Sequence, residues 1–171
     1  MSIRLKIIFH LIIDLGTRSI LIVKAAAVLI LCLVTFVLIR FVLLAKTSER
    51  LTPAHIGLSS GRLQNGPDKP NWVSSQTPTS DTAHFIEPLL SNKSAAELVL
   101  LFEQSGEARL KNHEGGYLHF EYRSWLFGFV DDLELLVGDG VIQVKSSSRV
   151  GYSDMGANRK RVENLRQRLA L

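Results

Sequence analysis

The run Lys145-Ser-Ser-Ser-Arg-Val-Gly-Tyr-Ser-Asp-Met-Gly-Ala-Asn-Arg-Lys-Arg161 decides the fold, because it joins a strand, a polar turn and the start of a basic helix. Residues 131–148 alternate apolar and polar side chains around Gly138-Asp139-Gly140, which predicts a β-hairpin. A primed two-residue turn at Asp139-Gly140 places Glu134 opposite Lys145, whereas a three-residue loop would pair Glu134 with Val144. We prefer the first register because it sets acid against base.

This register gathers polar side chains at the open end of the hairpin. Asp131 and Asp132 fall opposite Ser148 and Ser147, beside Arg149. We expect one of these aspartates to hold Arg149, as a clamp between the hairpin end and the C-terminal helix. Neighbours on a strand point to opposite faces, so the two aspartates cannot share a proton as a catalytic pair would. The candidate polar cluster comprises Arg123, Asp131, Asp132, Ser146, Ser148, Arg149, Tyr152, Asp154, Asn158 and Arg159.

A basic helix is predicted to follow Tyr152. Asp154 suits its N-cap, and Asn158 is a competing cap. Its expected apolar stripe is Met155, Val162, Leu165 and Leu169, and its basic residues are Arg159, Lys160, Arg161, Arg166 and Arg168. The basic surface is open to three interpretations: a solvated face, a contact with anionic lipid, or a site for a partner or an anionic ligand.

The N-terminal part, residues 1–46, is predicted to anchor the chain in a membrane. Residues 1–24 suit an interfacial helix, and a span of about 20 residues follows, either Ile20 to Ile39 or Ala25 to Ala45. We prefer an uncleaved signal-anchor to a cleaved signal peptide or a buried core helix, because no small-x-small site with a polar start precedes Ala45. Basic residues flank the span on both sides, so they favour a cytoplasmic N-terminus only slightly.

The rest of the chain is expected to form a tether and a domain. Residues 47–82 are rich in Pro, Gly and Ser and predict a tether and irregular wrap, in which Trp72-Val73 packs onto the domain. Residues 83–171 predict the domain, with a capped helix from Ser94 to Gly106 and strands that include 107–111 and 117–122. The apolar run 125–130 is expected to be buried on both faces or against the membrane. The predicted fold class is α+β: an antiparallel sheet of four or five strands packed by two helices, preceded by one transmembrane helix.

The sequence lacks the residues that several kinds of binding or catalytic site require. Cys32, the single cysteine, lies in the apolar run, so no disulfide, zinc site or thiol nucleophile is expected in the domain. Residues 47–171 hold 14 basic and 15 acidic residues, which argues against nucleic acid as a partner. We expect no metal and no cofactor, and surface positions for His10, His55, His84, His113 and His119, which show no metal-ligand spacing. Ser146-Ser-Ser148 lacks the glycines of a nucleophile elbow.

Four motifs carry a resemblance to a known family: Tyr117-Leu118, Arg123-Ser124, Leu126-Phe-Gly-Phe-Val-Asp-Asp132, and Gln143 to Asp154 with Asn158-Arg-Lys-Arg161. Over about residues 65–169 the chain resembles the domain-of-unknown-function family 1499. The resemblance implies an exported or membrane-attached protein, so we expect the domain outside the cytoplasm, on the periplasmic side. Family members often carry cysteines around the motif at Pro67 to Ser75, where this chain has Gly66 and Trp72. A bridging role for those cysteines is therefore not expected.

Two functions remain from different classes. The first is a non-catalytic binding or accessory module at the membrane surface, whose partners are the lipid bilayer and a membrane protein or an anionic ligand. The alternative is a hydrolase-like enzyme that uses Asp131 or Asp132 with Arg149. The module predicts that the polar cluster is buried and mutually bonded, whereas the enzyme requires an aspartate exposed in a cleft.

Overall fold

The computed structural model describes residues 3–51, 53 and 55–170, with side chains described from residue 16 onward. The chain divides into two compact units, Met1–Val42 and Leu43–Leu171. Helix α1, Ile3–Arg50, forms most of the first unit, and its last residues belong to the second. Its part from Gly16 to Arg50 contains an apolar stretch with a mean hydropathy of 3.0. This part is long and apolar enough to cross a membrane, as an anchor or a signal sequence would be. The side chains of residues 1–15, more than half of the predicted interfacial segment and including His10, lie outside the described residues.

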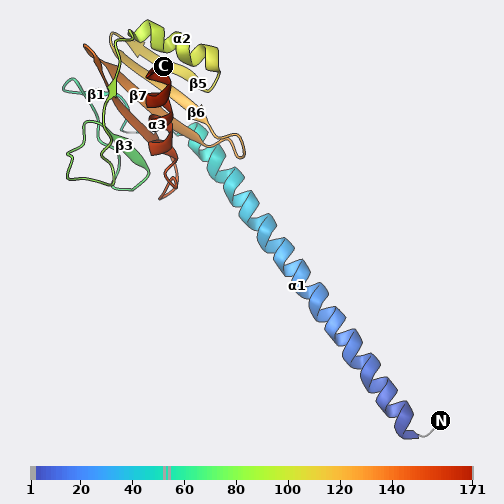
Figure 1. The fold of residues 1–171 in the computed structure, drawn as a ribbon. Coiled ribbons are helices and arrows are strands. Elements are labelled where there is room, and N and C mark those ends of the chain that lie inside the picture. The colour runs from blue at the N-terminus through green and yellow to red at the C-terminus, as the bar shows by residue number, and fades with distance from the viewer. Residues whose placement is uncertain (1–2, 52, 54, 171) are drawn as a thin grey trace. The chain divides into compact units, whose positions relative to one another are not determined.

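The second unit is built on a six-stranded antiparallel sheet in the order β3-β8-β7-β6-β5, with β4 also paired to β8 (Figure 1). The predicted α+β class is therefore confirmed, and the sheet is larger than expected because β3 and β4 extend it from a segment with few strand signals. The strands are β3 Trp72–Ser74, β4 Leu89–Leu90, β5 Ala108–Glu114, β6 Tyr117–Arg123, β7 Val130–Val137 and β8 Val141–Ser148. A separate ribbon pairs β1, Leu58–Ser59, with β2, Arg62–Leu63.

The hairpin of β7 and β8 has the predicted register, with Glu134 opposite Lys145 and Val137 opposite Ile142. Its turn centres on Asp139-Gly140, since the amide of Gly138 donates to the carbonyl of Val141 at 2.9 Å. The primed turn type is wrong, however. Gly140 has φ +70°, but Asp139 is not among the described residues with positive φ. A Cβ makes that region costly, so glycine alone adopts it here.

One face of the sheet packs against helices α2, Ala95–Ser105, and α3, Ala157–Leu169, around an apolar core. The predicted capping box is confirmed, because Ser94 accepts from the amide of Glu97 and Gly106 ends α2 in the left-handed conformation. The core contains Val73, Ile86, Leu89, Leu98, Phe102, Leu118, Phe120, Leu133, Leu135, Ile142, Val144, Val162 and Leu165.

One expectation about apolar residues is wrong, and of another only one of its two alternatives is excluded. Met155 is 98% exposed, because it precedes the Gly156 cap of α3 and therefore never joins the stripe of Val162 and Leu165. The run 125–130 is not buried on both faces, since Trp125 is 93% and Leu126 62% exposed. These two residues form the connection between β6 and β7 rather than part of a strand, so no sheet neighbour covers them.

Candidate functional site

The sheet face opposite the core is polar and yet largely buried. Strand alternation places on it the side chains that we call the polar face: Tyr117, His119, Glu121, Asp132, Glu134 and Lys145. Residues from the end of α1 and the segment after it contact this face, including Ser48, Leu51, His55 and Gly57. Buried charges are costly unless they are paired, so each charge on this face requires a partner.

Arg149 is the centre of one buried network. Its Nε and Nη2 donate to the two carboxylate oxygens of Asp132 at 2.8 and 2.6 Å, and Nη2 also reaches Glu121 at 2.6 Å. The predicted contact of Arg149 with Asp132 is thus confirmed. The other end of the clamp was predicted wrongly, because Nη1 donates to the carbonyls of Ser48 and Leu51 at 3.3 and 3.2 Å and not to the C-terminal helix.

Burial and ion pairing have opposite effects on the pKa values of the two carboxylates in this network. Burial alone would raise the pKa of Asp132, but hydrogen bonds with Arg149 and His119 outweigh it and hold that pKa below the ordinary value. The pKa of Glu121 is lowered in the same way, against its own burial, by Arg149 and then by Lys111. His119 Nε2 lies 2.7 Å from Asp132 Oδ1, and its ring is buried, so the predicted surface position is wrong for this histidine.

A second network joins Glu134 and Lys145, which are both fully buried. Lys145 Nζ lies 2.7 Å from Glu134 Oε2 and also donates to the carbonyl of His55. The other carboxylate oxygen accepts from the Tyr117 hydroxyl at 2.8 Å and the Gly57 amide at 2.6 Å. Burial and then the Glu134 charge raise the pKa of Tyr117, so this hydroxyl stays a proton donor. Each charge therefore has several partners, which a buried pair needs.

The core side of the hairpin end holds a third network, centred on Arg161. Its Nη2 lies 2.7 Å from Asp131, while Nη1 donates to the oxygens of Ser146 and Asn158 at 2.8 and 2.6 Å. Asn158 in turn donates to the Ser148 hydroxyl at 3.0 Å. Asp131 and Asp132 therefore lie on opposite faces, as strand alternation predicts. Arg161 was missing from the candidate cluster, although its place one helical turn after Asn158 could have indicated it.

The remaining candidates lie at the edges of these networks. Asp154 accepts from the amides of Gly156 and Asn158 at 3.0 and 2.8 Å, so it bonds the first turn although Gly156 is the cap. Arg159 donates to the carbonyl of Ala83 at 3.1 Å, and Tyr152 is exposed. Arg123, which we expected beside the aspartates, pairs instead with Glu49 at 2.7 Å.

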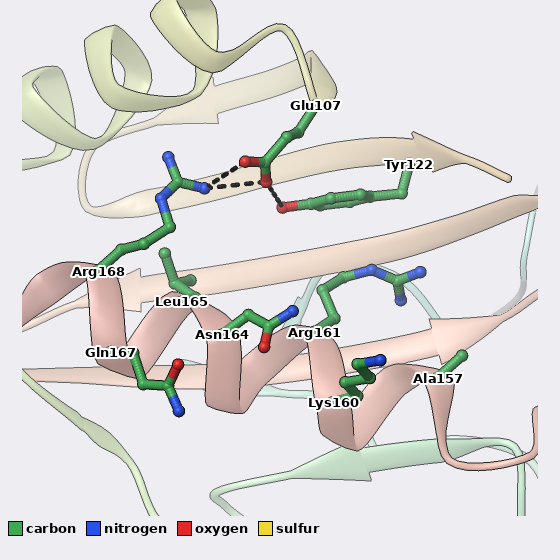
Figure 2. Close-up of a pocket in the computed structure, with 9 residues that line it drawn as sticks. All are labelled: Glu107, Tyr122, Ala157, Lys160, Arg161, Asn164, Leu165, Gln167 and Arg168. Carbon is green, nitrogen blue, oxygen red and sulfur yellow. Dashed lines mark hydrogen bonds and ion pairs between the residues drawn. The ribbon is translucent and has the colours of Figure 1, made fainter. Parts of the chain in front are cut away.

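An open groove of about 610 Å³ lies beside α3, on the core side of the sheet (Figure 2). Tyr122 of β6 presents its ring there, with the Arg161 guanidinium 4.6 Å from the ring centroid. Glu107, just after α2, is held by Arg168 through contacts of 2.7 and 2.9 Å. The lining residues are Glu107, Tyr122, Ala157, Lys160, Arg161, Asn164, Leu165, Gln167 and Arg168.

Hydrogen-bond donors predominate around this groove. Lys160, Arg161 and Arg168 carry positive charge, and Asn164 and Gln167 add amides, against the single acid Glu107. Burial and the Glu107 charge raise the pKa of Tyr122, which keeps its hydroxyl neutral. Among the described residues, no group of three or more His, Cys, Asp or Glu side chains is placed to hold a metal ion. The groove therefore offers a chemistry suited to an anion.

Together, these features define a small α+β domain that follows one apolar helix and carries buried ion networks and a basic groove. The family model described as Protein of unknown function (DUF1499) matches residues 62–169, more than half of the chain. The chain belongs to this family, as its motifs indicated. No curated protein and no solved structure matches it significantly.

Proposed function

We propose that this chain is a single-pass, membrane-anchored binding module whose domain lies outside the cytoplasm and takes a small anionic ligand in the groove beside α3. The groove carries the proposal, because three cationic side chains of one helix line it. The apolar helix supports the anchor by its length and hydropathy. The placement outside the cytoplasm is supported by the small excess of basic residues before the span and by the family resemblance.

The positions of the aspartates favour binding over hydrolysis. Asp132 is buried, and both of its oxygens contact Arg149. Asp131 is engaged by Arg161, and neither aspartate lines the groove. A general acid or base must come within hydrogen-bond reach of its substrate. The acid that does line the groove, Glu107, is held twice by Arg168, so it acts here as a support for a cation.

Lys160 has a distinct place among the groove cations. Arg161 and Arg168 each have a carboxylate partner, Asp131 and Glu107, whereas no ion pair within the described part of the chain engages Lys160, which is exposed. Its ammonium is therefore available to a ligand without breaking an existing pair. Arg161 and Arg168 line the same groove, and guanidinium geometry suits carboxylate and phosphate oxygens alike.

The test is ligand-dependent stabilisation of the full chain in phosphatidylcholine nanodiscs. Inorganic phosphate and a dicarboxylate such as succinate are titrated at constant ionic strength, with chloride as the reference salt, and thermal unfolding is recorded. Binding to the folded state raises the melting temperature in proportion to ligand occupancy. We expect Lys160→Ala to weaken the binding of the effective anion about tenfold or more, because it removes a charge-assisted hydrogen bond.

Lys69→Ala is the matched control, since Lys69 is an exposed lysine that does not line the groove. This variant should respond to the anion like the parent chain. Alanine favours a helix, so Lys160→Ala should leave α3 intact. An equal response of parent and Lys160→Ala, or no response beyond that to chloride, would overturn the groove as an anion site.

A further inference from the structure

The connection between β6 and β7 exposes large apolar side chains on a turn closed by backbone hydrogen bonds. Trp125 and Leu126 are 93% and 62% exposed. The turn is closed by the Ser124 amide donating to the carbonyl of Phe129 and by the Gly128 amide donating to the carbonyl of Ser124, both at 2.9 Å. Gly128 takes φ +75°, which a glycine adopts without cost. These bonds set the backbone of this tip, residues 124–129, on which the indole is exposed.

Two contacts place the tip beside the end of α1. Arg123, which leads into the tip, pairs with Glu49 at 2.7 Å, and the amide of Val130, which follows it, donates to Ser48 Oγ at 3.0 Å. Figure 1 shows this connection next to the last turns of α1. Leu43 and Leu44, at the start of those turns, are exposed as well. The tip therefore lies beside the last turns of α1, which carry exposed apolar side chains of their own.

We infer that the tip inserts Trp125 and Leu126 into the interfacial layer of the bilayer, beside the point where α1 leaves it. The inference rests on the membrane anchor proposed above. Tryptophan is enriched at that depth because its ring is apolar and its N–H remains hydrated. Arg50 and Arg123, both exposed, supply cations at the level of the phosphates.

The inference requires one of the two spans that the sequence left open. Glu49, which holds Arg123, follows Ala45 by four residues, or about 6 Å of helix, whereas it follows Ile39 by about 15 Å. The interfacial layer on each side of the hydrocarbon core is about 5–8 Å thick. A tip beside Glu49 therefore reaches the interface if the span is Ala25 to Ala45, and it stands clear of the lipid if the span ends at Ile39.

The test measures tryptophan fluorescence of the full chain in phosphatidylcholine vesicles that contain lipid brominated near the head of its acyl chains. Bromine quenches only an indole that is in contact with the bilayer. The chain has two tryptophans, and Trp72 is buried in the domain. We expect most of the Trp125 signal, taken as parent minus Trp125→Phe, to be quenched by the lipid and protected from aqueous iodide.

The matched control is Leu90→Trp in the Trp125→Phe background. Leu90 is exposed and pairs with Val141, at the opposite end of the sheet from the tip, about 24 Å away along the strands. Its indole should be quenched by iodide and spared by the lipid.

Flotation of the vesicles tests the proposed membrane anchor separately from the insertion of the tip. A chain that fails to float contradicts the anchor itself. If the chain floats and Trp125 is quenched by iodide, the tip is in water and the inference is wrong. If Trp125 is shielded from both quenchers, a protein surface covers the tip and the inference is equally overturned.

Discussion

Arg149 donates to five oxygens of four residues from three segments of the chain, so its removal leaves several buried groups without a partner. We expect Arg149→Ala and Asp132→Ala each to lower the free energy of unfolding by about 2–4 kcal/mol, because the remaining charge stays buried and unpaired. Arg149→Lys should recover little, since an ammonium cannot reproduce the planar fork. Denaturant unfolding of the full chain in nanodiscs measures these changes.

The double variant provides the control for this pair. If the two side chains act as one unit, Arg149→Ala with Asp132→Ala should cost less than the sum of the single changes. Single variants that unfold like the parent would show that the pair does not stabilise the domain.

Gly66 and Trp72 depend on each other, because the tryptophan ring packs against the glycine backbone. A Cβ on Gly66 would lie 2.5 Å from atoms of the Trp72 ring, which also stacks on His84 with 4.1 Å between centroids. We expect Gly66→Ala to destabilise the domain by about 1–3 kcal/mol, as overpacking does. The same unfolding measurement checks this, with Gly16→Ala, where a Cβ meets nothing within 4 Å, as the control. Equal stability of the two variants would contradict it.

At the scale of elements, the polar face makes the stability of the domain depend on pH. Asp132 and Glu121 have lowered pKa values in the folded state, so acid favours the unfolded chain, which binds the protons more readily. Their contribution is complete above the unfolded pKa values, about 4, and is lost as pH falls through the lower folded values. We expect the free energy of unfolding to fall steadily below about pH 5.

Arg149→Ala tests the cause of this dependence. Without the guanidinium, the folded pKa values rise toward the unfolded ones, so the acid slope should flatten. The slope comes from denaturant unfolding at a series of pH values, with Lys69→Ala as the control. A slope that is equally steep in Arg149→Ala would assign the acid sensitivity to other groups.

The elements differ in how far the sequence predicts them. Alternation and turn residues predicted the β7–β8 register, and the capping box predicted α2, because both depend on neighbours along the chain. The short strand β4 escaped prediction, since pairing with β8 and not its two residues creates it. The pairing of the arginines with the aspartates could not be predicted for a similar reason. The sequence placed Asp131 and Asp132 on opposite faces of the sheet but left open which of them holds Arg149. Arg149 bonds to Ser48 and Leu51, which cover the polar face, and so it meets Asp132, whereas Arg161 reaches Asp131 from α3.

For the whole molecule, the proposed topology predicts the location of the C-terminus. A reporter fused after Leu171 that is active only outside the cytoplasm should be active, because a single span with a cytoplasmic N-terminus delivers everything after it to the other side. A cytoplasm-specific reporter at the same position is the control and should be silent. The reverse pattern would place the domain in the cytoplasm, while leaving the groove and its ligand unaffected.

The contact between Arg149 and the end of α1 also sets an order of events during biosynthesis. The carbonyls of Ser48 and Leu51 accept from a side chain that emerges from the ribosome 101 and 98 residues later. Closing so long a loop is slow, so under the proposed topology the helix would enter the bilayer before these two carbonyls gain their partner. We expect these bonds to form after the folding barrier, so Arg149→Ala should accelerate unfolding and leave the folding rate nearly unchanged, as rapid dilution from denaturant would show. The bonds from Arg149 to Ser48 and Leu51 are therefore expected to be among the last native contacts to form.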